Sequence, residues 1–229
     1  MPRSARIVLP GIPHHITQRG NNRQDVFHTS VDRTVYLSFL TKQSVSAGLN
    51  VLGYCLMPNH VHLVATPNKA DSLATAVGRT HFLYALYFNS VYNRSGHLWQ
   101  NRFYSCGLDD ERLWTVLRYV ERNPVRASIV NVAWDYAWSS AAVHAGEAEG
   151  RGLLDLTGWR EKWSPSDWKE VLGRGEEDRV LNELRSYTKQ GLPLCGEEML
   201  SSLERALGHS VRPLPVGRPK KGKTSDERR

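Results

Sequence analysis

The chain has 229 residues, enough for one sizeable domain with an appendage, and it carries a net charge of +7. Its three cysteines, Cys55, Cys106 and Cys195, are far apart and lack zinc-binding spacing, which predicts reduced thiols rather than a disulfide framework. No apolar run approaches the roughly 18 residues of a membrane span and no signal-peptide hydrophobic stretch is present, so we expect a cytoplasmic protein.

Hydrophobic periodicity predicts an alternation of strands and helices over the first half of the chain. The expected elements are a strand at 13–19, a helix at 32–47, paired strands at 51–57 and 61–66, a helix from about 70 to 92, a strand at 98–107 and a helix after 109. The buried face of the long helix should hold Leu73, Val77, Thr80, Tyr84, Tyr87 and Val91. This order predicts an α+β fold, a ferredoxin-like antiparallel sheet flanked by helices.

Beyond about residue 150 the composition changes to tryptophans among alternating charges. Ser164-Pro165 begins one helix, with proline at its permitted first position, and two more helices are expected at 176–187 and 197–207. A DNA-binding three-helix unit and a structural appendage both fit this pattern. We therefore predict a first domain over 1–145, a small helical region over 150–211 and a disordered basic tail over 212–229.

Two histidines, His60 and His62, lie one residue apart at the start of the second paired strand, just after a Pro58-Asn59 turn. Residues i and i+2 of a strand point to the same face, about 6.6–6.8 Å apart. Two neutral imidazoles in this arrangement can converge on one divalent cation. The alternative is a half-buried strand whose histidines satisfy each other or the backbone.

The helix after residue 109 has acidic residues in its first turn, where the helix dipole favours them. Its expected buried stripe consists of Leu113, Val116, Leu117 and Val120. Arg112 and Tyr119 lie on an adjacent polar stripe, and Asn123 follows four residues later, on the same face if the helix passes the residue before Pro124. Tyr119 is then either an amphipathic boundary residue or a nucleophilic phenol beside an amide oxygen.

Three motifs occur in a characteristic order: Met-Pro-Asn before His-hydrophobe-His, then Leu-Trp-Gln-Asn-Arg-Phe-Tyr at 98–104, then Arg-Tyr-Val-Glu-Arg-Asn-Pro-Val-Arg-Ala at 118–127. Together with the opening segment 14–22, they resemble the REP-associated tyrosine transposases, single-tyrosine members of the HUH endonuclease superfamily. The resemblance covers roughly residues 5–145. It implies that His60 and His62 bind a metal, that Tyr119 is the nucleophile, and that Asn123 supplies a third ligand where the insertion-sequence branch usually has glutamine.

The resemblance implies a metal-dependent DNA transposase or endonuclease that cleaves and rejoins single-stranded or hairpin DNA at REP-type repeats. The intermediate would be a 5′-phosphotyrosine, the cofactor Mg²⁺ or Mn²⁺, and the protein a monomer or homodimer. A divalent cation is chemically reasonable because a phenol with a pKa near 10 is a poor nucleophile at neutral pH. Tyr104 is a rival nucleophile, whereas the spacing of Tyr84, Tyr87 and Tyr92 suits core packing. Two alternatives are a catalytically silent DNA-binding protein acting on repeats and a hydrolase that uses water.

Residues 212–229 contain seven basic and two acidic residues, so the tail holds +5 of the net charge of +7. Within it, Val-Gly-Arg-Pro-Lys-Lys at 216–221 resembles an AT-hook, whose arginine enters a narrow minor groove. A generic solvated basic terminus is the alternative. The DNA contacts that we expect are Arg19, Arg112, Arg218, Lys220 and Lys221.

Overall fold

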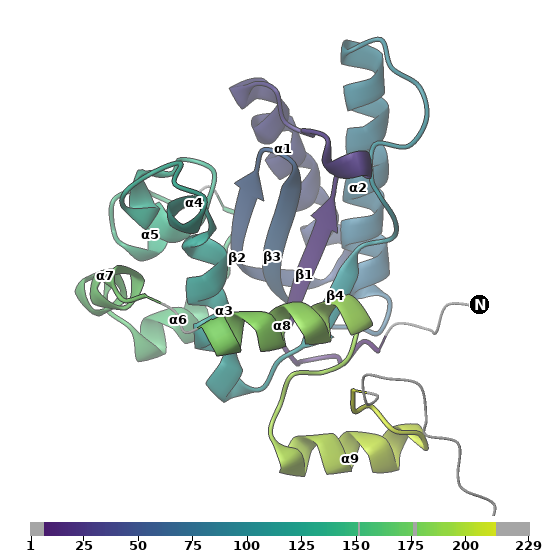
Figure 1. The fold of residues 1–229 in the computed structure, drawn as a ribbon, viewed down its shortest axis with the longest axis vertical. Helices are drawn as coiled ribbons and strands as arrows, with labels where there is room; N and C mark the ends of the chain where they lie inside the picture. Colours follow the sequence, from purple (N-terminus) through teal and green to yellow (C-terminus); the bar gives the residue numbers. More distant parts are fainter. Residues whose placement is uncertain (1–6, 151, 176–177, 214–229) are drawn as a thin grey trace, which may run out of the picture.

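The computed structural model describes residues 7–150, 152–175 and 178–213 (Figure 1). The strands are β1 (His14–Arg19), β2 (Leu49–Met57), β3 (His60–Pro67) and β4 (Tyr104–Gly107). The α-helices are α1 (Ser30–Ala47), α2 (Ser72–Val91), α3 (Asp110–Glu121), α4 (Asn123–Arg126), α5 (Ala141–His144), α6 (Thr157–Lys162), α7 (Pro165–Gly173), α8 (Asp178–Gln190) and α9 (Glu197–Leu207). Short 3-10 turns lie at Asn21–Arg23 and Ala133–Asp135. In the described part of the chain, no helix is long and apolar enough to cross a membrane.

The four strands form one sheet in the order β2-β3-β1-β4, and every neighbouring pair is antiparallel. This arrangement confirms the expected ferredoxin-like α+β fold. The last strand is shorter than the expected 98–107, because only Tyr104–Gly107 pairs with β1 along its length. The preceding residues instead cross the end of β1, where Gln100 donates its backbone N–H to the Arg19 carbonyl.

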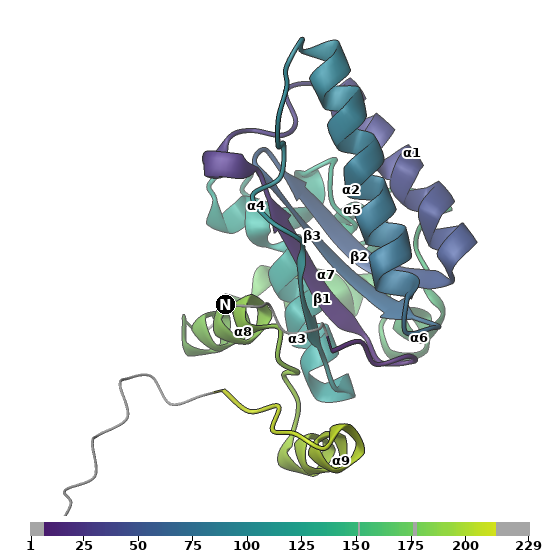
Figure 2. The same cartoon turned by 90° about the vertical axis from the view of Figure 1, so that its right-hand side faces the viewer.

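One face of the sheet is covered by α1 and α2 (Figure 2). The side chains that point to this face form the larger core, which includes Ile16, Tyr36, Leu40, Val61, Leu63, Ala65, Tyr84 and Phe88. The expected buried face of α2 is confirmed for its first four residues but is wrong for Val91, which is 53% exposed. The reason is that α2 extends beyond the sheet and ends at this residue, so that Phe88 supplies its last core contact (Figure 1).

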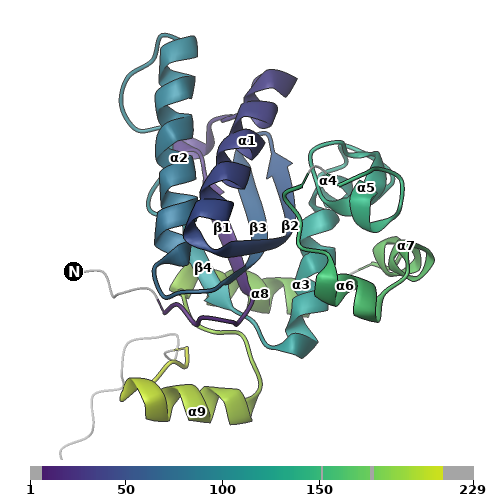
Figure 3. The ribbon, with the colours of Figure 1, turned by 180° about the vertical axis from the view of Figure 1, so that it is seen from behind.

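The opposite face of the sheet is covered by α3 and by helices from the last third of the chain (Figures 2 and 3). The expected apolar stripe of α3 is confirmed, since all four residues are buried. They share a second core with residues of the later helices and the segment after α8, namely Trp159, Trp168, Leu172, Leu181, Leu184 and Leu194. The structure therefore packs α7 against α3, and α8 against β4 and β1, while the division at about residue 150 stays a prediction.

Two of the expected helices begin with a capping box. Thr29 and Asp32 form a capping box at the start of α1, and Ser164 and Asp167 form another at the start of α7. Asp32 additionally accepts hydrogen bonds from the hydroxyls of Tyr87 on α2 and of Tyr92, the residue that follows α2. These contacts join the two helices that cover the first face of the sheet.

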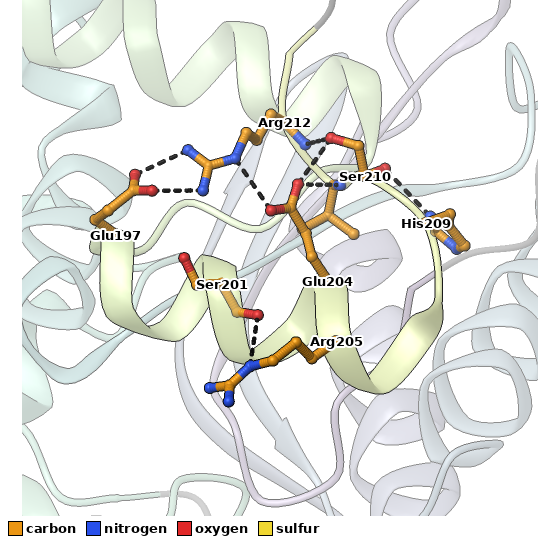
Figure 4. A network of polar contacts seen from close by, with 8 residues as sticks. Glu197, Ser201, Glu204, Arg205, His209, Ser210 and Arg212 are labelled. Carbon is orange, nitrogen blue, oxygen red and sulfur yellow. Dashed lines mark hydrogen bonds and ion pairs between the residues drawn. The ribbon is translucent and has the colours of Figure 1, made fainter.

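The described chain ends beside α9, where Arg212 forms ion pairs with Glu197 and Glu204 (Figure 4). The shortest of these contacts joins Arg212 Nη2 and Glu197 Oε1 at 2.5 Å. One of the seven basic residues of the expected tail is therefore engaged by carboxylates. The AT-hook-like segment, with Arg218, Lys220 and Lys221, lies outside the described residues.

Candidate active site

A cavity of about 620 Å³ opens between the sheet, the α3–α4 corner and α8. It brings together most of the residues that the sequence indicated. Among its lining residues are Arg19, His60, His62, Tyr104, Tyr119 and Asn123. Arg112 lies elsewhere, near the start of α3, where its guanidinium pairs with Asp109 at 2.7 Å.

Strand alternation places both histidines of β3 on the cavity side. Val61 and Leu63 point into the core under α1 and α2, so His60 and His62 point the opposite way, toward α3. On the neighbouring strand β1, Arg19 lies opposite His60 and Thr17 opposite His62. A register slip of one residue would send both imidazoles into the larger core, so the apolar pattern of β3 fixes the position of the pair.

The two imidazole rings are nearly perpendicular, with centroids 4.9 Å apart. His60 Nδ1 lies 2.6 Å from Asn59 Oδ1, and His62 Nδ1 lies 2.9 Å from His15 Nε2. Each Nδ1 is thus engaged, and no side chain or backbone group of the described residues hydrogen-bonds to either Nε2. These two Nε2 atoms are the ring nitrogens available to a cation.

The electrostatic environment keeps both histidines neutral. Burial lowers the pKa of His60 to about 4, and the nearby guanidinium groups of Arg19 and Arg126 contribute to this shift. Burial also holds the pKa of His62 well below its ordinary value, with His60 and His15 adding to the effect. A neutral imidazole is the form that binds a metal ion, so both ligands are already in the binding form at neutral pH.

Tyr119 is 5% exposed, and its ring stands edge-on to His62 with centroids 5.6 Å apart. The guanidinium carbon of Arg126 lies 4.1 Å from the centroid of the same ring. Of the rival phenols, Tyr104 is 37% exposed and lines the cavity from β4. The hydroxyl of Tyr84 donates to the Val26 carbonyl within the larger core, as the spacing of the α2 tyrosines suggested.

Asn123 lines the cavity as the first residue of α4, which is separated from the end of α3 at Glu121 only by Arg122, a residue that keeps right-handed helical geometry. Its Nδ2 donates to the carbonyls of Tyr119 and Val120, which fixes the direction of the amide. Its Oδ1 accepts a hydrogen bond of 2.6 Å from Arg126. The amide oxygen expected as a third ligand is therefore present but paired with a cation.

The donor set fits a divalent cation with few protein ligands. In the described ranges, no group of three His, Cys, Asp or Glu side chains gathers around one point. The available donors are two neutral imidazoles with anchored Nδ1 atoms, and Asn123 Oδ1 would join them if Arg126 released it. Such a site leaves coordination positions for water and for an anionic substrate, as catalytic sites require.

Sequence reasoning missed several residues of this cavity. They are His15 on β1, Arg126 on α4, and Arg185, Thr188 and Lys189 on α8. The adjacent pair His14-His15 in the first predicted strand was a signal for a third histidine. The expected helix at 176–187 included Arg185 but stopped before Thr188 and Lys189, whereas α8 continues to Gln190. Nothing in the sequence shows that α8 returns to the sheet.

The family model described as "Transposase IS200 like" matches residues 10–123, which include the histidine pair, Tyr119 and Asn123. A Haemophilus influenzae protein named REP-associated tyrosine transposase is 34% identical over 98 residues, a stretch covering 38% of this chain and 55% of that protein. A solved structure of the REP-associated tyrosine transposase bound to a REP hairpin has the same fold, with a TM-score of 0.53, 17% identity, and coverage of 72% of this chain and 92% of that one. Over residues 10–123, this chain belongs to the IS200-like transposase family.

Proposed function

We propose that this protein is a metal-dependent DNA transposase that cleaves and rejoins single-stranded or hairpin DNA through Tyr119, acting at REP-type repeats. The observation that carries the proposal is the packing of the Tyr119 ring against His62 in one cavity with His60. Similarity to the Haemophilus protein and to the REP-hairpin complex supports the choice of DNA. Residues 1–145 would form the catalytic unit.

The reaction conserves phosphodiester bonds. The Tyr119 phenol oxygen attacks phosphorus and loses its proton, the bond from phosphorus to the 3′ oxygen breaks, and that oxygen takes up a proton to become a free 3′-OH. A 3′-OH can attack the phosphotyrosine in the reverse sense, so rejoining needs no ATP. Bound at His60 and His62, Mg²⁺ or Mn²⁺ would supply Lewis-acid polarisation of the scissile phosphate.

The cationic residues of the cavity suit the rest of this reaction. Arg126, stacked on the Tyr119 ring, places positive charge where the attacking phenol becomes negative. Arg19 on β1 and the pair Arg185 and Lys189 on α8 line the same cavity from two sides. In this proposal they bind phosphates that flank the scissile one, and they hold the strand in register with Tyr119.

A catalytically silent DNA-binding protein is the second candidate, and one contact favours it. Because Arg126 engages Asn123 Oδ1, the site presents two metal donors rather than three unless that contact breaks. Binding of DNA through the cavity cations would need neither metal nor phenol. The two candidates therefore differ in whether a covalent intermediate forms.

The test uses a single-stranded DNA that folds into a REP-type hairpin and carries a fluorophore at its 3′ end, because a 5′-phosphotyrosine retains the 3′ fragment. After incubation with Mn²⁺ and denaturing electrophoresis, we expect the label to migrate with the protein, and EDTA to prevent this. Cut DNA without protein-bound label would indicate a hydrolase that uses water. Binding without any cutting would indicate the silent DNA-binding protein.

A further inference from the structure

We infer that His15 and Thr188 are positioning residues, which fix the ring nitrogen of His62 that carries the proton and so present His62 Nε2 to the metal. This inference rests on the proposed function, in which His62 is a metal ligand. It assigns α8, which lies beyond the family-matched residues 10–123, a direct part in completing the active site.

Three buried side chains, His62, His15 and Thr188, are linked by two hydrogen bonds. His62 Nδ1 lies 2.9 Å from His15 Nε2, and His15 Nδ1 lies 2.9 Å from Thr188 Oγ1. The two imidazole rings are stacked, with an interplanar angle of 10° and centroids 5.2 Å apart. All three side chains are at most 5% exposed, so water does not readily replace these partners.

Which atom donates the proton in each of these hydrogen bonds is decided at the Thr188 end of the network, beside Cys106. Cys106 on β4 donates its thiol proton to the Gly107 carbonyl, which can only accept. Thr188 is the hydroxyl next to Cys106, and a sulfur that has already given its proton to Gly107 can only accept from that hydroxyl. The Thr188 oxygen is then left to accept from His15 Nδ1–H.

This direction determines the tautomer of His62. A neutral imidazole carries one N–H, so His15 with its proton on Nδ1 has a bare Nε2 that accepts from His62 Nδ1–H. His62 Nε2 is then unprotonated, as a metal ligand must be. The reverse direction would place a proton on His62 Nε2 and block the ligand.

The packing of α8 positions Thr188 next to His15. Leu181 and Leu184 of α8 are buried in the second core, and His15 lies opposite Cys106 in the pairing of β1 with β4. The hydroxyl is therefore held against β1 by packing rather than by the hydrogen bond alone. For that reason, removal of the hydroxyl should change the proton position without moving the helix.

The experiment compares wild type with Thr188→Val, a substitution of similar shape without the acceptor. Nitrogen-15 spectra of the histidine side chains in metal-free protein should show His62 as the Nδ1–H tautomer in wild type, and substantially as the Nε2–H tautomer in Thr188→Val. Mn²⁺ affinity, measured by titration without DNA, should fall ~10–100-fold in the variant. Thr188→Ser, which keeps the hydroxyl, should retain the wild-type tautomer.

A matched control is Thr80→Val, which removes a buried hydroxyl that bonds within α2, on the other side of the sheet. An Nε2–H tautomer of His62 in wild type, or a tautomer and Mn²⁺ affinity unchanged in Thr188→Val, would overturn the inference. If wild-type protein bound no Mn²⁺, that result would instead contradict the proposed function. The tautomer spectra need neither metal nor DNA, so the two failures are distinguishable.

Discussion

The Glu121 carboxylate accepts a hydrogen bond from the Trp168 indole, with 2.8 Å between Oε2 and Nε1. Both side chains are completely buried, and the other carboxylate oxygen of Glu121 is contacted by Ser140 and His144. Glu121 lies two residues after Tyr119 at the end of α3. The helices α5 and α7 thus hold the end of the helix that carries the proposed nucleophile.

Replacement of Trp168 by phenylalanine should therefore destabilise the protein by removing one specific hydrogen bond. Glu121 would keep its burial but lose a donor, which costs about 1–3 kcal/mol beyond the reduced packing. Trp163→Phe is the matched control, because the buried Trp163 indole nitrogen has no hydrogen-bond partner among the described residues. Urea unfolding of both variants checks this prediction, and equal losses of stability would contradict it.

His60→Ala should abolish DNA cleavage and leave DNA binding largely intact. Removal of a residue that merely hydrogen-bonds to a metal ligand reduces activity ~10–100-fold, so removal of the ligand itself should reduce it further. In the proposed function, DNA binding rests on the cavity cations and the basic tail, which the substitution spares. His97→Ala changes an exposed histidine outside the cavity and serves as the control. Cleavage at the wild-type rate by His60→Ala would remove the metal hypothesis.

Metal-free protein should lose stability as pH falls below about 6.5. Burial lowers the pKa of His15 and His81 to about 3, and that of His14 and His60 to about 4. The unfolded chain therefore binds protons near pH 6.5 that the folded chain does not, and each such histidine contributes a slope of up to about 1.4 kcal/mol per pH unit. The contribution of these neutral histidines to the free energy of unfolding should be fully present above pH 7 and should decrease as the pH falls toward 4.

Urea unfolding at pH 7.5, 6.5 and 5.5 measures this slope. His81 lies in the larger core, where its ring bonds the Tyr36 hydroxyl and is remote from the cavity. His81→Gln removes one of these protonation sites, so its stability should depend less steeply on pH than that of wild type. A free energy of unfolding that stays constant between pH 7.5 and 5.5 would show that the buried histidines are accessible to protons.

Truncation after Pro213 should weaken DNA binding and flatten its dependence on salt. The truncation removes the six basic residues beyond that point but spares Arg212, which pairs with Glu197 and Glu204 (Figure 4). Each phosphate that the tail no longer neutralises should lower the slope of log affinity against log salt by about 0.7 for single-stranded DNA. Cleavage at saturating DNA should persist. An unchanged slope would mean that the tail does not touch DNA.

The central part of the fold could be predicted because its signals are local. The alternation of apolar residues around His60 and His62 fixes which side of β3 faces α3. The acidic residues after position 108 and the Ser164-Pro165 pair mark where two helices begin. Val91 was misassigned because helical periodicity does not reveal where the sheet stops beneath the helix. The length of β4 was overestimated because an apolar segment can cross a strand end as well as pair with it.

The remainder of the candidate site depends on contacts between distant parts of the chain. His15 and Thr188 are 173 positions apart, and no periodic pattern links a first strand to a helix near the C-terminus. The contact of Arg126 with Asn123 Oδ1 likewise depends on the corner between α3 and α4, a conformation that Pro124 made hard to foresee. Local patterns identified the chemistry of the site, and tertiary packing supplied its supporting residues.

The most direct measurement is identification of the residue that becomes covalently attached to DNA. Wild-type protein would be trapped on the 3′-labelled hairpin with Mn²⁺, digested with nuclease and protease, and analysed by mass spectrometry. We predict a 5′-linked nucleotide on the peptide that contains Tyr119, and no adduct for Tyr119→Phe, which should still bind DNA and Mn²⁺. A nucleotide on Tyr104 instead, or an adduct that persists in Tyr119→Phe, would contradict the assignment of Tyr119 as the nucleophile.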